Sequence, residues 1–193
     1  MSIDLKGLSS IGAINNSMCN FLLGRLKDDH KRFECLFGEL ERQCAKKEAG
    51  HAVDTSTLEA ICGHLRNRTL LFHHALEEAI YARLVQIQPR FRDVYDLTED
   101  HRRSWREFDR FATVVSNVQA NFVTATLSFI SNERGHYILE EEIFFRHAGK
   151  FLLRGDWQDL EQSKAASELM ADSACDPIVA GLLQNAMQPP AMP

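Results

Sequence analysis

Residues 71–84 read LFHHALEEAIYARL, and a near copy of this stretch returns at residues 135–148 as GHYILEEEIFFRHA. When the two copies are aligned on their paired acids, a histidine stands four residues before a glutamate in each. Residues four apart lie on the same face of an α-helix, so the spacing predicts that each pair can reach one bound ion. The two pairs are His73 with Glu77 and His136 with Glu140.

A second repeated feature precedes each copy. The sequence LKDDHKRF contains His30 and the sequence LTEDHRRS contains His101, each a single histidine directly after two acids. The chain therefore carries, twice, a lone histidine that is followed 43 or 35 residues later by His-x-x-x-Glu. This duplication predicts one site to which both halves of the chain contribute similar side chains.

Length and composition restrict the class of protein. At 193 residues, 45% of them hydrophobic, the chain can bury the core of one domain. A net charge of −5 without a basic run argues against a nucleic-acid partner. The five cysteines form no C-x-x-C pair and no secretory signal is present, so we expect reduced thiols and a cytoplasmic protein. The uncharged window 111–132 is too rich in Ser, Thr, Asn and Gln for a membrane span.

Apolar residues recur at steps of three and four along most of the chain, which predicts long helices with one buried stripe each. Pro89 ends the second of these helices, and no segment shows the alternation typical of strands. Short connections between long helices favour an all-α fold, an antiparallel up-down four-helix bundle. The predicted helices run from Asn16 to about Glu48, from a cap at Asp54, Thr55 or Ser56 to about Gln88, from about Arg90 to Ser116 and from about Gln119 to Leu152.

The predicted helices also define the domain organisation. We expect an irregular N-terminal lead-in at residues 1–15, the bundle at 16–153 and a short helical C-terminal tail at 154–193 that covers one side of the bundle. For each pair of adjacent antiparallel helices, we compare the number of residues between each repeated histidine and the connection that joins the two helices. The two numbers agree to within about one turn of helix. The four histidines should therefore form a single layer across the bundle.

Four imidazoles and two carboxylates in an apolar core would be costly without partners. One interpretation is a hydrogen-bonded network without metal. The duplicated His-x-x-x-Glu favours a metal site instead, and imidazole with carboxylate suits Fe, Mn or Zn. Two carboxylates that can bridge favour two ions. The predicted ligands are His30, His73, Glu77, His101, His136 and Glu140.

This ligand pattern resembles that of the hemerythrin-like, or HHE cation-binding, family over residues 20–152. The resemblance implies a four-helix bundle with two iron ions, joined by an oxo or hydroxo bridge and without haem. It also implies dioxygen, nitric oxide or peroxide as small ligands, or the handling of iron itself. The chain departs from the oxygen carriers of the family, which have His-x-x-x-His in the third helix and an aspartate in the fourth, where this chain has Trp105 and Glu140.

Several neighbours of the predicted ligands have more than one interpretation. His74 is either an extra ligand, as the resemblance implies for this position, or a partly exposed residue at the rim, which its rotation of about 100° from His73 favours. Glu78 and Glu141 should be solvated or hydrogen-bonded to a ligand. We also expect three residues to surround the ligands without binding the metal: Trp105, Glu133 and His147.

These observations lead to a functional hypothesis. We expect a cytosolic di-iron protein that binds or reduces small oxidants, as a monomer or weak homodimer, and such a protein could have peroxide- or nitric-oxide-handling activity. The alternatives are a sensor or interaction protein that responds to iron or oxygen through its C-terminal tail, and a protein for iron storage or delivery.

Overall fold

The computed structural model describes residues 5–116, 118, 120–171 and 175–187, with side chains from residue 21 to 186. Among these residues every regular element is a helix. The elements are α1 (Leu5–Glu48), α2 (Thr55–Leu65), η1 (Arg66–His73), α3 (His74–Ile87), η2 (Pro89–Asp93), α4 (Leu97–Val115), α5 (Phe122–Leu139), η3 (Glu140–Phe144), α6 (Phe145–Phe151), α7 (Arg154–Glu161), α8 (Lys164–Met170) and α9 (Pro177–Met187).

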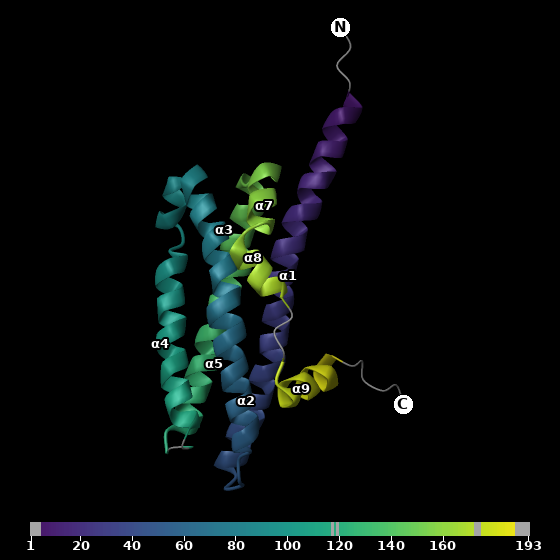
Figure 1. Ribbon diagram of the computed structural model, residues 1–193. Helices are drawn as coiled ribbons and strands as arrows, with labels where there is room; N and C mark the ends of the chain where they lie inside the picture. The colour runs from purple at the N-terminus through teal and green to yellow at the C-terminus, as the bar shows by residue number, and fades with distance from the viewer. Residues whose placement is uncertain (1–4, 117, 119, 172–174, 188–193) are drawn as a thin grey trace.

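Long helical segments lie side by side and position the site. The helix α1, the continuous segment α2–η1–α3, the helix α4 and the continuous segment α5–η3–α6 run along one another in Figure 1, while the N-terminal part of α1 extends beyond the others. Two separate clusters of buried apolar side chains hold these segments together. One cluster, which includes Leu26, Leu84 and Phe144, lies toward α7 and α8, and the other includes Phe37, Leu58 and Phe129.

The helix boundaries follow from local chemistry. Asp54 caps α2 by accepting a hydrogen bond from the backbone N–H of Thr57 at 3.2 Å. Asp96 caps α4 by accepting one from Glu99 at 3.3 Å. Pro89 starts the short 3₁₀ segment η2 at its first position. The third predicted helix therefore begins at Leu97 instead of about Arg90, because the chain makes a separate turn before the Asp96 cap.

Two further predicted boundaries differ from the structure. The expected irregular lead-in at 1–15 is wrong for the part that is described, since α1 already begins at Leu5. Extending an existing helix adds one hydrogen bond for each residue fixed, so weak helix formers such as Gly7 and Gly12 can be included. Residues 1–4 and 188–193 lie outside the described residues. Gln119, the predicted start of the fourth helix, also lies outside them, and α5 begins at Phe122.

The quoted repeats each contain a segment of wider helix. η1 and η3 are π-helical, so that a backbone N–H bonds to the carbonyl five residues earlier. At the end of η1 the N–H of His74 donates to the Thr69 carbonyl, and at the end of η3 the N–H of Phe145 donates to the Glu140 carbonyl. Both His-x-x-x-Glu motifs therefore lie where the regular periodicity of 3.6 residues is interrupted.

The C-terminal tail is attached by polar and apolar contacts. Trp157 of α7 is buried among the side chains of the first apolar cluster. Asp156 accepts hydrogen bonds from the backbone N–H of Leu153 at 2.7 Å and from Nε of Arg83 at 2.6 Å. Arg68 of η1 donates from Nη1 to the Leu169 carbonyl of α8 at 2.8 Å. Within the described residues, none of the helices has an apolar stretch long enough to cross a bilayer.

Candidate metal centre

The six predicted ligands come together in one buried layer. Along each long segment, these residues lie near the point where the buried apolar side chains change from one cluster to the other. All six side chains are at most 5% exposed. They come from α1 (His30), the η1–α3 junction (His73 and Glu77), α4 (His101) and the α5–η3 junction (His136 and Glu140).

The first group of donors surrounds His30 and His73. Their Nε2 atoms lie 3.1 Å apart. Nε2 of His30 is 3.3 Å from Oε2 of Glu140, and Nε2 of His73 is 3.2 Å from Oε1 of Glu77. Metal–ligand bonds of about 2.0–2.2 Å place neighbouring ligands of one ion about 3 Å apart, so these four atoms are suitably spaced for one cation.

The second group surrounds His101 and His136. Nε2 of His136 is 3.1 Å from Oε1 of Glu140, and Nε2 of His101 is 3.4 Å from the same oxygen. Nε2 of His101 also lies 3.4 Å from Oε2 of Glu77. His74 belongs to this group, since one donor atom each from His74, Glu77, His101 and His136 lies within 4.8 Å of every other.

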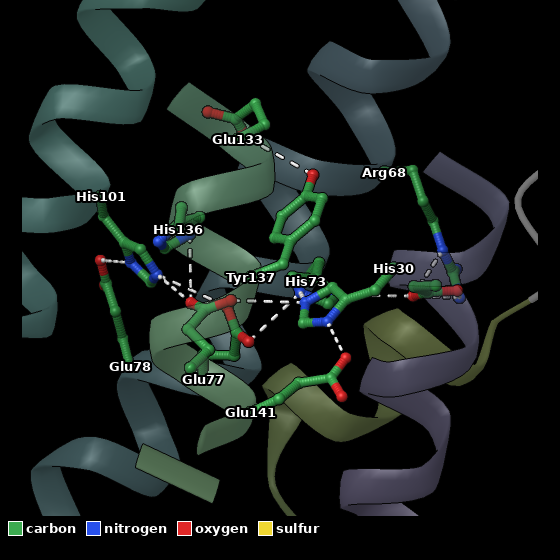
Figure 2. Close-up of polar contacts among 12 residues, drawn as sticks. His30, Arg68, His73, Glu77, Glu78, His101, Glu133, His136, Tyr137 and Glu141 are labelled. Atoms are coloured by element: carbon green, nitrogen blue, oxygen red, sulfur yellow. Dashed lines mark hydrogen bonds and ion pairs between the residues drawn. The ribbon is translucent and has the colours of Figure 1, made fainter. Parts of the chain in front are cut away.

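The two glutamates connect the groups. Glu77 directs Oε1 toward His73 and Oε2 toward His101. Glu140 directs Oε2 toward His30 and Oε1 toward His101 and His136. Figure 2 shows Glu77 between His101 and His30, in the middle of the layer. Each carboxylate therefore offers one oxygen to each imidazole group, as a ligand that bridges two cations would.

Unpartnered polar atoms support a bound cation. Several fully buried donor atoms in this layer have no hydrogen-bond partner, although a buried polar group without one is destabilising. A cation that accepted their lone pairs would remove this cost, so the residues fit a metal site. These atoms are Oε1 and Oε2 of Glu77, Oε2 of Glu140, Nε2 of His136 and both ring nitrogens of His74.

The charges of the buried side chains in the layer also favour a bound cation. Burial lowers the pKa of His73, but the charges of Glu77 and Asp29 outweigh it and raise that pKa to about 10. Burial likewise opposes protonation of His101, and the carboxylates of Glu140 and Glu77 raise its pKa well above the usual value. Without a cation, protons on the imidazoles would balance the buried carboxylates. A metal ion can replace those protons.

Comparison with known proteins agrees with this geometry. The family model of the hemerythrin HHE cation-binding domain matches residues 22–148. The chain belongs to this family. The match to the HHE domain includes all six predicted ligands and His74, and it ends before α7, so the C-terminal tail lies outside it. No curated protein and no solved structure matches the chain significantly.

Each of the four repeated histidines in this HHE domain has a carboxylate on its outer nitrogen, Nδ1. Such a partner fixes the ring orientation and makes the imidazole a better ligand. The His73 contact is at ion-pair distance, and the other three are hydrogen bonds. The pairs are His30 with Glu141 at 2.8 Å, His73 with Asp29 at 3.6 Å, His101 with Glu78 at 3.1 Å and His136 with Asp100 at 2.9 Å.

These partners repeat between the two halves of the HHE domain. The acid directly before each lone histidine orients the histidine of the neighbouring motif, as Asp29 does for His73 and Asp100 for His136. The acid directly after each predicted bridging glutamate orients a lone histidine, as Glu78 does for His101 in Figure 2. Asp29 and Asp100 were not among the predicted site residues. Their position before each lone histidine was the available signal, but only the packing of helices shows which ring each acid contacts.

Asp29 and Asp100 have partners of their own. Arg68 contacts both oxygens of Asp29 at 3.2 Å, through Nε and Nη2, and both side chains are nearly inaccessible to solvent. The hydroxyl of Tyr95 donates to Oδ2 of Asp100 at 2.7 Å. Burial would raise the pKa of Asp29, but His73 and Arg68 outweigh it and keep the pKa below its usual value. Asp29 is therefore ionised where it faces His73.

The predicted rim position of His74 is wrong. Its side chain is 2% exposed and stacks on the His101 ring, with the centroids 3.9 Å apart. The expectation assumed 3.6 residues per turn, whereas the wider π-helical turn of η1 lets His73 and His74 both face the interior. Burial also lowers the pKa of His74 well below its usual value, so its ring is neutral, as a metal ligand must be.

The three other predicted neighbours occupy different places. Glu133 is buried, and it accepts a hydrogen bond from the Tyr137 hydroxyl at 3.4 Å (Figure 2). The Tyr137 ring in turn stacks on His30 with the centroids 4.2 Å apart. Trp105 is half-buried against the second apolar cluster. His147 donates from Nδ1 to the Ile143 carbonyl at 2.7 Å and packs against Phe91.

Proposed function

We propose that this chain is a non-haem di-iron protein that binds or reduces small oxidants, namely dioxygen, nitric oxide or peroxide. The observation that carries the proposal is the pair of buried carboxylates, Glu77 and Glu140, each with one oxygen toward each of two imidazole groups. Imidazole with carboxylate and without thiolate suits iron among the common metals. When bound, two ferrous ions would supply electrons to a small oxidant.

The two donor groups are unequal, which supports binding of a small ligand on one side. The first group offers two imidazoles, His30 and His73, whereas the second offers three when His74 is included. Both groups share the oxygens of the two glutamates. We infer that an ion held by the first group would keep more coordination positions open for an external ligand. In the second group, His74 would occupy the corresponding position.

A hollow at the surface leads to the less crowded side. It has a volume of about 400 Å³, and its lining includes His30, Tyr137 and Ile138. The predicted ligands other than His30 do not line the hollow and are at most 3% exposed, so we propose that only small molecules reach them from this side. Tyr137 lines the hollow and donates a hydrogen bond from its hydroxyl to Glu133 at 3.4 Å, and burial raises the pKa of Glu133. Glu133 can therefore hold a proton close to the site.

Further features belong to the same proposal. We propose that the long helical segments form an up-down antiparallel four-helix bundle, which the contacts of α4 with α5 and of α1 with α5 support. We also propose a cytosolic monomer or weak homodimer without a nucleic-acid partner. The net charge of −5 supports the absence of a nucleic-acid partner, and the cysteine pattern supports the cytosolic location.

The test compares small ligands on one preparation. The protein is loaded with ferrous iron without oxygen, and its visible spectrum is recorded as oxygen, nitric oxide or peroxide is added in separate experiments. The proposal predicts a rapid spectral change with at least one of them. The change should be the same in repeated preparations that have equal iron content. A His136→Ala variant should lose most of the iron and the response. An iron-loaded parent whose spectrum changes with none of the three would contradict the proposal.

One contact favours a second candidate, a sensor that responds to iron or oxygen. Arg68 joins Asp29, the partner of His73, to the Leu169 carbonyl of the C-terminal tail. A change at His73 can therefore reach α8 through three successive polar contacts, from His73 to Asp29, from Asp29 to Arg68 and from Arg68 to Leu169. Hydrogen exchange of α7–α9, compared between metal-free and iron-loaded protein, tests this candidate. It predicts a change in protection of α8, and equal protection in the two forms would exclude it.

A further inference from the structure

A second cluster of charged side chains lies outside the metal centre, in a hollow lined by residues of α1, α2, η1 and α9. We call it the basic hollow. It has a volume of about 380 Å³ and is lined by Arg25, Arg32, His64 and Arg68 on one side and by Ala180 and Leu183 of α9 on the other. None of its described lining residues carries a carboxylate. The acids Glu59 and Asp176 line an adjoining hollow that shares His64 and Arg68.

The guanidinium groups of the basic hollow outnumber their acidic partners. Asp29 is the one described carboxylate that forms ion pairs with them, at 3.1 Å from Arg68 and 3.7 Å from Arg32. Asp29 also faces His73. No described acid pairs with Arg25, and its Nε atom is buried without a hydrogen-bond partner. Three positive charges thus share one negative charge, and a buried donor faces no acceptor.

Such an arrangement suits an anion with several acceptor oxygens. Guanidinium groups present N–H donors in a fixed fork that matches phosphate oxygens, and these charge-assisted hydrogen bonds are among the strongest in proteins. The hollow is within the size range of small-ligand pockets, about 300–1,000 Å³, and exceeds what one phosphate group needs. The apolar side chains of Ala180 and Leu183 can contact the organic part of a phosphate ester.

We propose that the basic hollow is a binding site for a phosphate-class oxyanion, taken up as inorganic phosphate or as the phosphate monoester of a small molecule. Arg25 and Arg32 line the hollow and offer their guanidinium groups to the anion. Arg68 contributes charge but remains engaged with Asp29 and Leu169. This site is separate from the metal ligands, and its occupation requires no reaction at the metal centre.

Titration calorimetry on the full chain, with its bound metal and at constant ionic strength, tests the proposal. The probes are inorganic phosphate and phenyl phosphate. Arg25→Gln removes the charge and the unpartnered Nε, and Arg25→Lys keeps the charge but removes the fork. The matched control is Arg110→Gln, because Arg110 is 69% exposed and pairs with Glu107 on α4, away from the hollow. Circular dichroism checks that all variants are folded.

We expect one saturable site in the parent and in Arg110→Gln. Binding should weaken about tenfold or more in Arg25→Gln, as the loss of a charge-assisted hydrogen bond predicts, and by an intermediate factor in Arg25→Lys. Tighter binding of phenyl phosphate would identify a monoester as the ligand, and tighter binding of phosphate would identify the inorganic ion. Absence of saturable binding in the parent, or equal affinity in the parent and Arg25→Gln, would overturn the proposal.

Discussion

Replacing Asp29 with asparagine is expected to weaken both folding and metal binding. The Asp29 side chain is inaccessible to solvent, and its partner Arg68 is 7% exposed. Removing one member of a buried ion pair costs about 3–5 kcal/mol, because the other charge stays buried without compensation. Asparagine can still accept one hydrogen bond, so we expect about 3 kcal/mol. For a chain of this size that loss lowers Tm by about 6–12 °C.

The same change should reduce metal affinity. Asp29 is the carboxylate that faces Nδ1 of His73, and loss of such a partner weakens metal binding by about 10–100-fold. Urea unfolding of the metal-free protein measures the first effect, and competition with a chelator measures the second. Both measurements are needed, since a general loss of stability alone would not show that Asp29 orients the ligand.

The adjacent acid provides a matched control. Asp28 is 58% exposed and pairs with Lys31 on the surface of α1, so Asp28→Asn should change stability by no more than about 0.5 kcal/mol. The double variant Asp29→Asn, Arg68→Met removes both buried charges and should recover part of the lost stability. If Asp29→Asn behaves like Asp28→Asn in both assays, the assigned role of the buried pair is wrong.

Three further predictions concern His74, pH and nucleic acid. At equal iron loading, His74→Ala should react faster with oxygen and peroxide than the parent, because the second donor group loses a nitrogen; identical rates and spectra would show that His74 is not a ligand. The folded pKa of His73, about 10, exceeds its unfolded value of 6.5, so its stabilising effect is complete below about pH 6.5 and is lost as pH rises toward 10. Tm of the metal-free protein should therefore fall over this range while metal stabilisation grows, and a rise in metal-free Tm would contradict the assignment. Fluorescence anisotropy at physiological salt should show no DNA or RNA affinity beyond the non-specific level, and a sub-micromolar complex would refute that expectation.

The ligand layer was accessible from the sequence because its signals are local. Each His-x-x-x-Glu motif lies on one helix, and helix length sets the height of each histidine, so the sequence predicted the six residues that the structure brings together. The position of His74 was not accessible in this way. It depends on the π-helical turn of η1, which changes the direction of the side chains that follow. An analysis that assumes 3.6 residues per turn does not reveal such a turn.

The outer carboxylates were only partly accessible. Asp29 and Asp100 stand in repeated positions, yet each contacts a histidine on another helix, and that pairing depends on how the helices are rotated against one another. The attachment of the tail by Arg68 to Leu169 is likewise a contact between segments 101 residues apart. Periodicity shows which face of a helix is buried, but it does not show which buried partner that face meets.

The metal content of the folded chain tests the central claim most directly. The metal-free protein is loaded with ferrous iron under anaerobic conditions, freed of unbound metal, and analysed for iron and protein on the same sample. Two donor groups bridged by Glu77 and Glu140 predict about two iron ions per chain. A folded protein that retains one ion, or none, would contradict the account.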